Sequence, residues 1–249
     1  MIKLVSFEDP IFETIQGEGN LVGTPSVFVR FHGCDFSCDW CDTKDSWRPG
    51  SKFMSLPEEE VLTRIRKARY GHAVITGGNP LLQVDSLCYL LAGLHEQWLD
   101  RDLGDHWRSG MHTTVETQAS IFDGTVAQLA DMMSLSPKLH DWREDVVQDY
   151  LDIAARHQKS LQIKVVCWDE GTTLTAILRL NLLFERWMKL GGDVSRLHLV
   201  LQPEYSSGRY GMRSVISALD GHLRQTTAGF QYPNIRVIGQ THKNSLFVR

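Results

Sequence analysis

The stretch of sequence that decides the fold is VFVRFHGCDFSCDWCDT, at residues 27–43. Its first five residues are apolar apart from Arg30 and predict a strand that runs directly into a loop. The loop contains three of the chain's five cysteines, Cys34, Cys38 and Cys41, in the spacing C-x3-C-x2-C. Cysteines spaced this tightly indicate a disulfide, a zinc site or an iron–sulfur cluster.

The alternatives differ in how many ligands they need. A disulfide would leave one of the three thiols over, and nothing else suggests secretion. Structural zinc normally takes four protein ligands, commonly in two separated pairs, and His32 is so near Cys34 that it would close a strained tetrahedron. Cys88 and Cys167 stand alone in apolar stretches, where a buried, unreactive cysteine is expected. A cubane iron–sulfur cluster held by only three thiolates would leave one iron open to another ligand.

Composition limits the class of protein. The 249 residues suit one large domain, and 42% hydrophobic content can fill a substantial core. A net charge of -4 argues against a general nucleic-acid binder. The N-terminus turns acidic too early for a signal peptide, and no stretch is apolar for long enough to span a bilayer. We therefore expect a cytoplasmic protein in a reducing compartment, without direct nucleic-acid or membrane contact.

Short apolar strands alternate with helices along the chain. Strands are predicted at residues 73–76, 113–117, 161–166, 197–203 and 235–239, and a strand end at 134–138. Helices are predicted at residues 57–68, 84–98, 126–132, 146–158, 172–190 and 211–223, and a loop at 100–110. This alternation predicts βαβ units and a parallel sheet with too few strands for a closed eight-fold barrel. We predict a partial, open α/β barrel that forms one domain over residues 1–249.

Polar residues follow the predicted strands. In parallel α/β folds, ligands bind at the C-terminal ends of the strands. The cluster loop and several further segments lie just beyond such ends, namely residues 77–79, 116–117, 136–138, 202 and 240–242. The sequence therefore predicts that these segments form one site.

The cysteine loop resembles the cluster loop of the radical S-adenosylmethionine superfamily, because the C-x3-C-x2-C spacing has an aromatic residue, Trp40, before the last cysteine. The resemblance implies that Cys34, Cys38 and Cys41 bind a [4Fe–4S] cluster whose open iron takes the amino and carboxylate groups of S-adenosylmethionine. One electron then cleaves the sulfonium to methionine and a 5′-deoxyadenosyl radical. The fold implied is the open parallel β/α barrel of that superfamily.

Seven pieces of the chain, in order, resemble one family of that superfamily, the 7-carboxy-7-deazaguanine synthases. They are Thr14–Gly19, Arg30, Cys41–Thr43, Gly77–Pro80, Glu116–Gln118, Ser136–Lys138 and Gln240–His242. The resemblance implies that 6-carboxy-5,6,7,8-tetrahydropterin is rearranged to 7-carboxy-7-deazaguanine with loss of ammonia, assisted by Mg²⁺. It also implies a flavodoxin- or ferredoxin-type electron donor, a homodimer, and a product that feeds queuosine-type nucleosides.

The resemblance assigns five residues to the substrate. Gln16 offers an amide donor and acceptor to the pterin edge, while Glu18 and Glu116 accept from ring N–H groups. Arg30 suits the substrate carboxylate because its fork binds two oxygens at once, although a surface-paired arginine is the alternative. His242 is assigned to the substrate pocket because of the family resemblance. Without it, an isolated histidine near the end of the chain would be expected to be solvent-exposed. For the Gln16–Gly19 segment taken alone, the alternative is a plain turn.

Further residues are assigned to the cofactor and the metal. Thr43 is the candidate Mg²⁺ contact, with substrate oxygens supplying other ligands; without the family it would be a loop-capping hydroxyl. The residues assigned to S-adenosylmethionine are Trp40, Asp42, Gly77, Gly78, Asn79, Thr117, Ser136, Lys138 and Gln202. Lys138 could instead cap a helix or stay solvated. No residue is assigned a catalytic acid or base role.

Two other functions fit parts of the sequence. An activase that makes a glycyl radical on a partner protein shares the cysteine spacing, but often adds cysteine-rich segments that are absent here. A zinc-stabilised interaction module is the alternative outside enzymes. Anaerobic reconstitution with iron and sulfide separates these readings.

Overall fold

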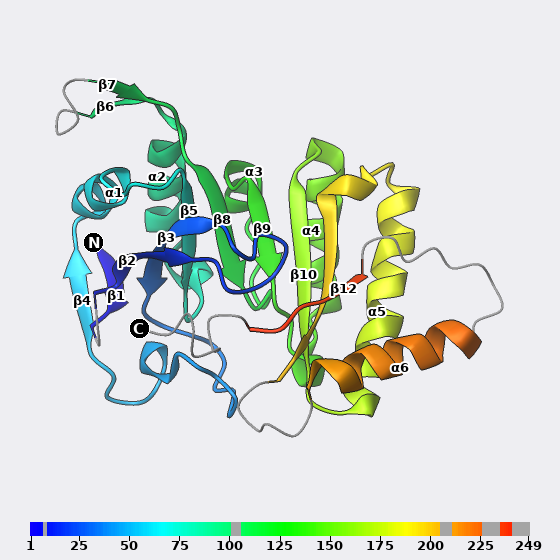
Figure 1. The fold of residues 1–249 in the computed structure, drawn as a ribbon. Coiled ribbons are helices and arrows are strands. Elements are labelled where there is room, and N and C mark those ends of the chain that lie inside the picture. The colour runs from blue at the N-terminus through cyan, green and yellow to red at the C-terminus, as the bar shows by residue number, and fades with distance from the viewer. Residues whose placement is uncertain (7–8, 101–105, 205–210, 226–234, 241–249) are drawn as a thin grey trace. The chain divides into compact units, whose positions relative to one another are not determined.

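The computed structural model describes residues 1–6, 9–100, 106–204, 211–225 and 235–240 (Figure 1). The chain forms two compact units. Unit 1 comprises Met1–Ile15, Thr24–Thr117 and Asp123–Met133; unit 2 comprises Gln16–Gly23, Gln118–Phe122 and Ser134–Arg249. That both units act as one domain stays a prediction.

Unit 1 contains a sheet in which three central strands are parallel. Its strands are β1 (Ile2–Val5), β2 (Ile11–Ile15), β3 (Pro25–Phe31), β4 (Phe53–Leu56), β5 (His72–Gly77) and β8 (His112–Thr117). The order is β4-β1-β3-β5-β8, and β2 also pairs with β3. Strands β3, β5 and β8 pair in parallel, whereas β1, β2 and β4 make antiparallel pairs.

The helices of unit 1 are α1 (Glu58–Arg66), α2 (Val84–His95) and α3 (Gly124–Leu129). Helix α2 packs between α1 and α3 (Figure 1). A hairpin of β6 (Trp98–Asp100) and β7 (His106–Arg108) follows α2. Short 3₁₀ helices lie at Lys44–Ser46 and Pro80–Gln83, and in unit 2 at Leu139–Asp141 and Val194–Arg196. The core includes Leu4, Val29, Phe31, Ile75 and Leu91, none of which is exposed.

Unit 2 contains three parallel strands, β10 (Ser160–Cys167), β11 (Leu197–Pro203) and β12 (Ile235–Val237). Strand β9 (Met132–Leu135) spans the boundary between the units. The helices are α4 (Glu144–His157), α5 (Glu170–Lys189) and α6 (Met212–Gln225). Helices α4 and α5 pack on β10, and α6 packs on α5. Among the described helices, none combines the length and apolar character that crossing a membrane requires.

The polar positions of β10 are as buried as its apolar ones. Leu161, Ile163 and Val165 alternate with Gln162 and Lys164, yet the latter two are only 3% and 7% exposed. A buried polar side chain needs hydrogen-bonding partners. The polar face of β10 must therefore contact other polar groups of unit 2.

The predicted α/β class with an open, mainly parallel sheet is confirmed, and most predicted elements are present. Strands β1, β2 and β4 were not predicted. The prediction of a loop at 100–110 was wrong for β7 and for the end of β6, where Trp98 and Trp107 have high strand propensity. The helix predicted at 84–98 ends at His95, because the next residue is extended. The helix predicted at 126–132 ends at Leu129, and β9 begins at Met132.

Candidate active site

The cysteine loop follows β3 and is held by its own backbone. Gly33 has a φ of 104°, which favours glycine, and its N–H donates to the Ser46 carbonyl at 2.8 Å. The N–H of Cys41 donates to the Cys38 carbonyl at 3.1 Å. The N–H of Thr43 donates to the Cys41 sulfur at 3.4 Å. The loop therefore folds back on itself around its cysteines.

None of the three cysteines of the loop is in a disulfide, and all three are partly exposed. Burial raises the pKa of the Cys34 thiol, and the nearby Asp35, Cys41 and Cys38 raise that pKa further, against a backbone hydrogen bond from Phe36. The thiols are thus close enough to influence one another electrostatically. Within the described residues, however, no three Cys, His, Asp or Glu side chains form a ready-made metal site.

The end of β5 packs closely against this loop. Gly78 N–H donates to the Phe31 carbonyl at 3.1 Å, and Asn79 N–H donates to the Gly33 carbonyl at 2.7 Å. A Cβ on Gly77 would lie 2.1 Å from the Phe31 oxygen, and a Cβ on Gly78 would lie 2.0 Å from the Gly33 oxygen. Gly77 also has a φ of 130°. Both glycines are therefore needed for the close approach of the two backbones.

The Asn79 side chain joins three segments of unit 1. It is fully buried. Its Nδ2 donates to Asp35 Oδ1 at 3.0 Å, and its Oδ1 accepts from Thr117 Oγ1 at 3.0 Å and from Leu81 N at 3.2 Å. Asn79 therefore links the cysteine loop to the C-terminal end of β8.

Arg30 and Thr43, predicted to bind substrate and Mg²⁺, lie together. Arg30 Nη1 donates to Thr43 Oγ1 at 3.1 Å, and Thr43 Oγ1 donates to Asp42 Oδ1 at 3.1 Å. The Arg30 guanidinium lies over the Phe12 ring, 5.3 Å from its centroid. The Arg30 guanidinium is thus fixed beside Thr43, two residues after the last cysteine of the loop.

Glu116 is held by a residue that the sequence did not identify. Thr76 Oγ1, on the neighbouring strand β5, donates to Glu116 Oε2 at 2.7 Å. Both residues lie near the C-terminal ends of their strands.

Trp40 lies half-buried on the cysteine loop.

The remaining predicted residues that are described belong to unit 2. Gln16 is 5% exposed, and its Oε1 accepts from Glu18 N at 3.1 Å. Glu18 Oε2 accepts from Lys164 Nζ, and Glu18 Oε1 accepts from Gln240 Nε2 at 2.5 Å. Polar contacts of Gln16 and Glu18 thus hold this loop within unit 2, and its role in substrate binding stays a prediction.

Two further predicted positions in unit 2 carry polar groups. Lys138 Nζ donates to Ser136 Oγ at 3.3 Å. Gln202 is 2% exposed, and its Oε1 has no hydrogen-bond partner within the part of the chain that the structure describes. His242 lies outside the described residues.

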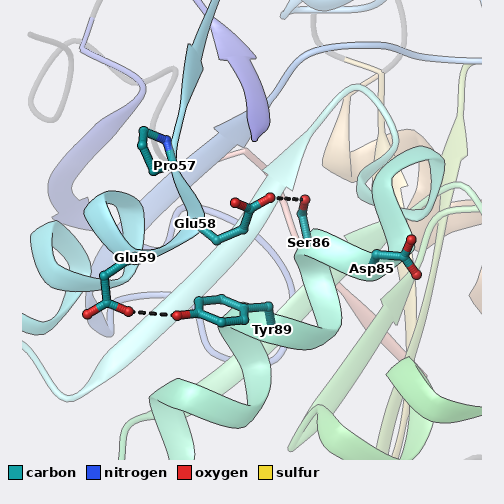
Figure 2. A pocket seen from close by; sticks show the side chains of 6 residues that line it. All are labelled: Pro57, Glu58, Glu59, Asp85, Ser86 and Tyr89. Atoms are coloured by element: carbon teal, nitrogen blue, oxygen red, sulfur yellow. Dashed lines mark hydrogen bonds between the residues drawn. The ribbon is translucent and has the colours of Figure 1, made fainter.

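A separate cleft of about 340 Å³ lies between α1 and α2 (Figure 2). Its lining is Pro57, Glu58, Glu59, Asp85, Ser86 and Tyr89. Ser86 Oγ donates to Glu58 at 2.8 Å, and the Tyr89 hydroxyl donates to Glu59 at 2.6 Å. None of the predicted site residues lines this cleft.

Comparison with known proteins identifies the family. The family model described as the radical SAM superfamily matches residues 28–164. The 7-carboxy-7-deazaguanine synthase of Thermoplasma acidophilum is 30% identical over 161 residues, which cover 62% of this chain and 72% of that protein. The chain belongs to the 7-carboxy-7-deazaguanine synthase family of the radical SAM superfamily.

Some other members of the family match over shorter parts of their length. The 7-carboxy-7-deazaguanine synthase of Halobacterium salinarum is 39% identical over 133 residues, 52% of this chain and 44% of that protein. The chain spans about half the length of such curated relatives. The crystal structure of QueE from Escherichia coli has the same fold, with a TM-score of 0.56 over 97% of this chain and 94% of that chain, at 18% identity.

The superfamily implies a [4Fe–4S] cluster and S-adenosylmethionine, and the residues present fit both. Three cysteines on one loop, none of them in a disulfide, suit a cluster that leaves one iron for another ligand. The buried acceptor of Gln202 suits a donor from a bound ligand, since such an atom is costly to leave unpaired.

Sequence reasoning gave no role to Thr76 or Lys164. The signal for Lys164 was a lysine inside a strand that the sequence places in the core, because a buried charge is almost always paired. Thr76, a common strand residue, carried no such signal.

Proposed function

We propose that this chain converts 6-carboxy-5,6,7,8-tetrahydropterin to 7-carboxy-7-deazaguanine, with ring contraction and loss of ammonia. The observation that carries the proposal is the similarity to the 7-carboxy-7-deazaguanine synthase of Thermoplasma acidophilum. The geometry agrees with it, because Arg30 is hydrogen-bonded to Thr43, directly after the cysteine loop. A cation in that position suits a substrate that carries a carboxylate.

In this proposal Cys34, Cys38 and Cys41 hold the [4Fe–4S] cluster. The cluster and S-adenosylmethionine, when bound, supply the radical that starts the rearrangement. Gly77 and Gly78 hold the cysteine loop against β5, and Asn79 ties that loop to Thr117. We assign these four residues to S-adenosylmethionine. We assign to it also Trp40, Asp42, Ser136, Lys138 and Gln202.

We assign the substrate to residues whose orientation is fixed by neighbours. Arg30 lies over the Phe12 ring and presents its fork to the substrate carboxylate. Glu116, oriented by Thr76, accepts from ring N–H groups. Gln16 and Glu18 contact the pterin edge. His242, which lies outside the described residues, is assigned to the substrate on the family resemblance. A site of several fixed donors and acceptors discriminates strongly against ligands that lack the matching groups.

Magnesium is expected at Thr43. The Thr43 oxygen already accepts from the Arg30 guanidinium at 3.1 Å. A Mg²⁺ ion at Thr43 and the Arg30 guanidinium would repel each other unless an anion, such as the substrate carboxylate, lay between them. We therefore expect Mg²⁺ and the substrate carboxylate to tighten each other's binding by the same factor.

The Thr43→Ala variant tests the metal assignment. It should keep its cluster and still cleave S-adenosylmethionine, but pterin turnover should respond less to Mg²⁺ than in the wild type. The measurement is a Mg²⁺ titration of both reactions in both proteins. The same Mg²⁺ response in the two proteins would limit Thr43 to supporting the loop.

The proposal includes the cellular setting. None of the five cysteines is in a disulfide, which suits a reducing cytoplasm. A flavodoxin- or ferredoxin-type donor would supply the electron, the product would enter queuosine-type nucleosides, and the chain would work as a homodimer. The substrate is a small molecule rather than a protein or nucleic acid.

Anaerobic reconstitution tests the function. The protein is loaded with iron and sulfide, reduced, and given S-adenosylmethionine, Mg²⁺ and the pterin, and products are followed by mass spectrometry. We expect 7-carboxy-7-deazaguanine and ammonia in equal amounts. Cleavage of S-adenosylmethionine without conversion of the pterin would refute the proposal and favour an activase-type enzyme.

A further inference from the structure

Glu18 and Lys164 form an ion pair inside unit 2. Lys164 lies on β10, and its Nζ contacts Glu18 Oε2. The Lys164 side chain is only 9% exposed and the Glu18 side chain 15%. Removing two charges from water is costly, and a buried ion pair is often no more stabilising than apolar residues of the same volume. The pair is therefore better explained by what the carboxylate does than by stability alone.

The neighbouring Gln162 holds the same loop. It lies two residues before Lys164, on the same face of β10. Its Oε1 accepts from Asn20 N at 2.5 Å, and its Nε2 donates to Ser134 Oγ at 2.7 Å. Gly19 has a φ of 70°, and a Cβ there would lie 2.3 Å from Gln162 Oε1. The polar face of β10 thus fixes the loop on both sides of Gly19.

The Glu18 carboxylate is oriented through both of its oxygens. Lys164 donates to Oε2, and Gln240 Nε2 donates to Oε1 at 2.5 Å. Two donors on different oxygens fix the plane of a carboxylate. Since a carboxylate has about four acceptor directions, these contacts still allow it to accept from a ligand.

We propose that Lys164 is a positioning residue, whose ammonium holds the Glu18 carboxylate in the orientation that accepts hydrogen bonds from the ring N–H groups of the pterin. The inference rests on the proposed function and deepens it. Lys164 acts through Glu18 and does not itself touch the substrate. It thereby contributes to selection of ligands with N–H donors on that edge.

A double-mutant cycle on binding tests this role. The reconstituted protein with S-adenosylmethionine and Mg²⁺, but without reductant, binds the pterin without turnover, and isothermal titration calorimetry gives the Kd. Lys164→Met should weaken binding by about tenfold, as expected when a charge-assisted hydrogen bond no longer orients the acceptor. Glu18→Gln should weaken binding to a similar extent. In the Glu18→Gln background, Lys164→Met should cause no further loss, because the two residues act as one unit.

Matched variants guard against misfolding. Arg186→Met removes another ion pair of unit 2, in which Arg186 contacts Asp152 at 2.8 and 2.7 Å, and it should leave the Kd unchanged. The Glu18→Gln, Lys164→Met double variant contains no unpaired buried charge and should fold. Lys164→Gln keeps a donor and replaces Lys164→Met if that variant does not fold; it should weaken binding less than Lys164→Met.

Three results would overturn the inference. An unchanged Kd in the Lys164 single variants would make the ion pair purely structural. Additive losses in the double variant would mean that Lys164 acts independently of Glu18. If the wild type itself does not bind the pterin, the proposed function fails and takes this inference with it, which distinguishes that failure from the other two.

Discussion

At the scale of single residues, Arg30 shows how a side chain is fixed before any ligand arrives. Its guanidinium donates to Thr43 on one side and lies over the Phe12 ring on another. Phe12 in turn stacks on Phe28, its partner across the β2–β3 pair, with centroids 5.5 Å apart. The guanidinium is therefore held by a strand pair and by the cysteine loop.

Arg30→Lys keeps the charge but loses the planar fork. We expect KM for the pterin to rise by about tenfold, the equivalent of one charge-assisted hydrogen bond, while cleavage of S-adenosylmethionine without substrate stays the same. Steady-state kinetics of both reactions measure this. Arg186→Lys, which alters a fork in unit 2, is the control. Unaltered pterin kinetics in Arg30→Lys would assign Arg30 to packing alone.

The cysteines divide into two classes. Burial raises the pKa of Cys167 to about 11 and also raises the pKa of Cys88. Burial raises the pKa of Cys34 as well, so the two classes are distinguished by their place in the chain: Cys34, Cys38 and Cys41 share one loop, whereas Cys88 lies on α2 and Cys167 on β10. Replacing Cys34, Cys38 or Cys41 by alanine should abolish the cluster, whereas Cys88→Ala and Cys167→Ala should keep it. Iron and sulfide analysis with the visible spectrum measures this, and loss of the cluster from either of the last two variants would contradict the assignment.

At the scale of elements, the end of β5 shapes the cysteine loop. A Cβ on Gly78 would lie 2.0 Å from the Gly33 oxygen and 2.8 Å from Cys34 Cβ. Gly78→Ala should therefore displace the loop, lower the iron content, and reduce the unfolding free energy by about 1–3 kcal/mol. Gly71→Ala is the matched control, because a Cβ there meets nothing within 4 Å. Full iron content in Gly78→Ala would show that the loop does not depend on this contact.

Sequence reasoning succeeded where local pattern and tertiary structure agree. Strands such as β5 and β11 are mostly apolar runs, and β8 is rich in β-branched residues; polar or breaking residues follow each of them. The antiparallel strands β1 and β4 are short, and β4 alternates half-buried with exposed residues, so their pairing depends on partners distant in sequence. The C-terminal strand ends were predictable for the same reason as the strands. The Lys164–Glu18 pair was not, because its partners are 146 residues apart.

At the scale of the whole molecule, a buried histidine should make stability depend on pH. His72 is 5% exposed, and its ring contacts Ser26 Oγ at 2.8 Å and Thr114 Oγ1 at 2.9 Å. Burial and, to a smaller extent, the nearby His112 lower the pKa of His72 from 6.5 to about 4, against an opposing effect of Asp131. The unfolded state therefore takes up a proton at a higher pH than the folded state does.

His72 should accordingly cost stability as the pH falls from about 6.5 to about 4, by roughly 3 kcal/mol at most, with no further loss below that range. Urea unfolding at several pH values measures this. His72→Gln should reduce the acid sensitivity, whereas substitution of His157, an exposed histidine on α4, should not. Equal acid sensitivity in the wild type and His72→Gln would contradict the assignment.

The central claim is the proposal that the chain rearranges a pterin by radical chemistry, with S-adenosylmethionine regenerated in each turnover, as the resemblance to the 7-carboxy-7-deazaguanine synthases implies. The most direct measurement is the ratio of 7-carboxy-7-deazaguanine formed to S-adenosylmethionine consumed, in reduced, reconstituted protein with the pterin and Mg²⁺. We predict several product molecules for each S-adenosylmethionine consumed, each lighter than the substrate by one ammonia. Consumption of S-adenosylmethionine with no such product, in a protein whose cluster is fully loaded, would contradict the claim.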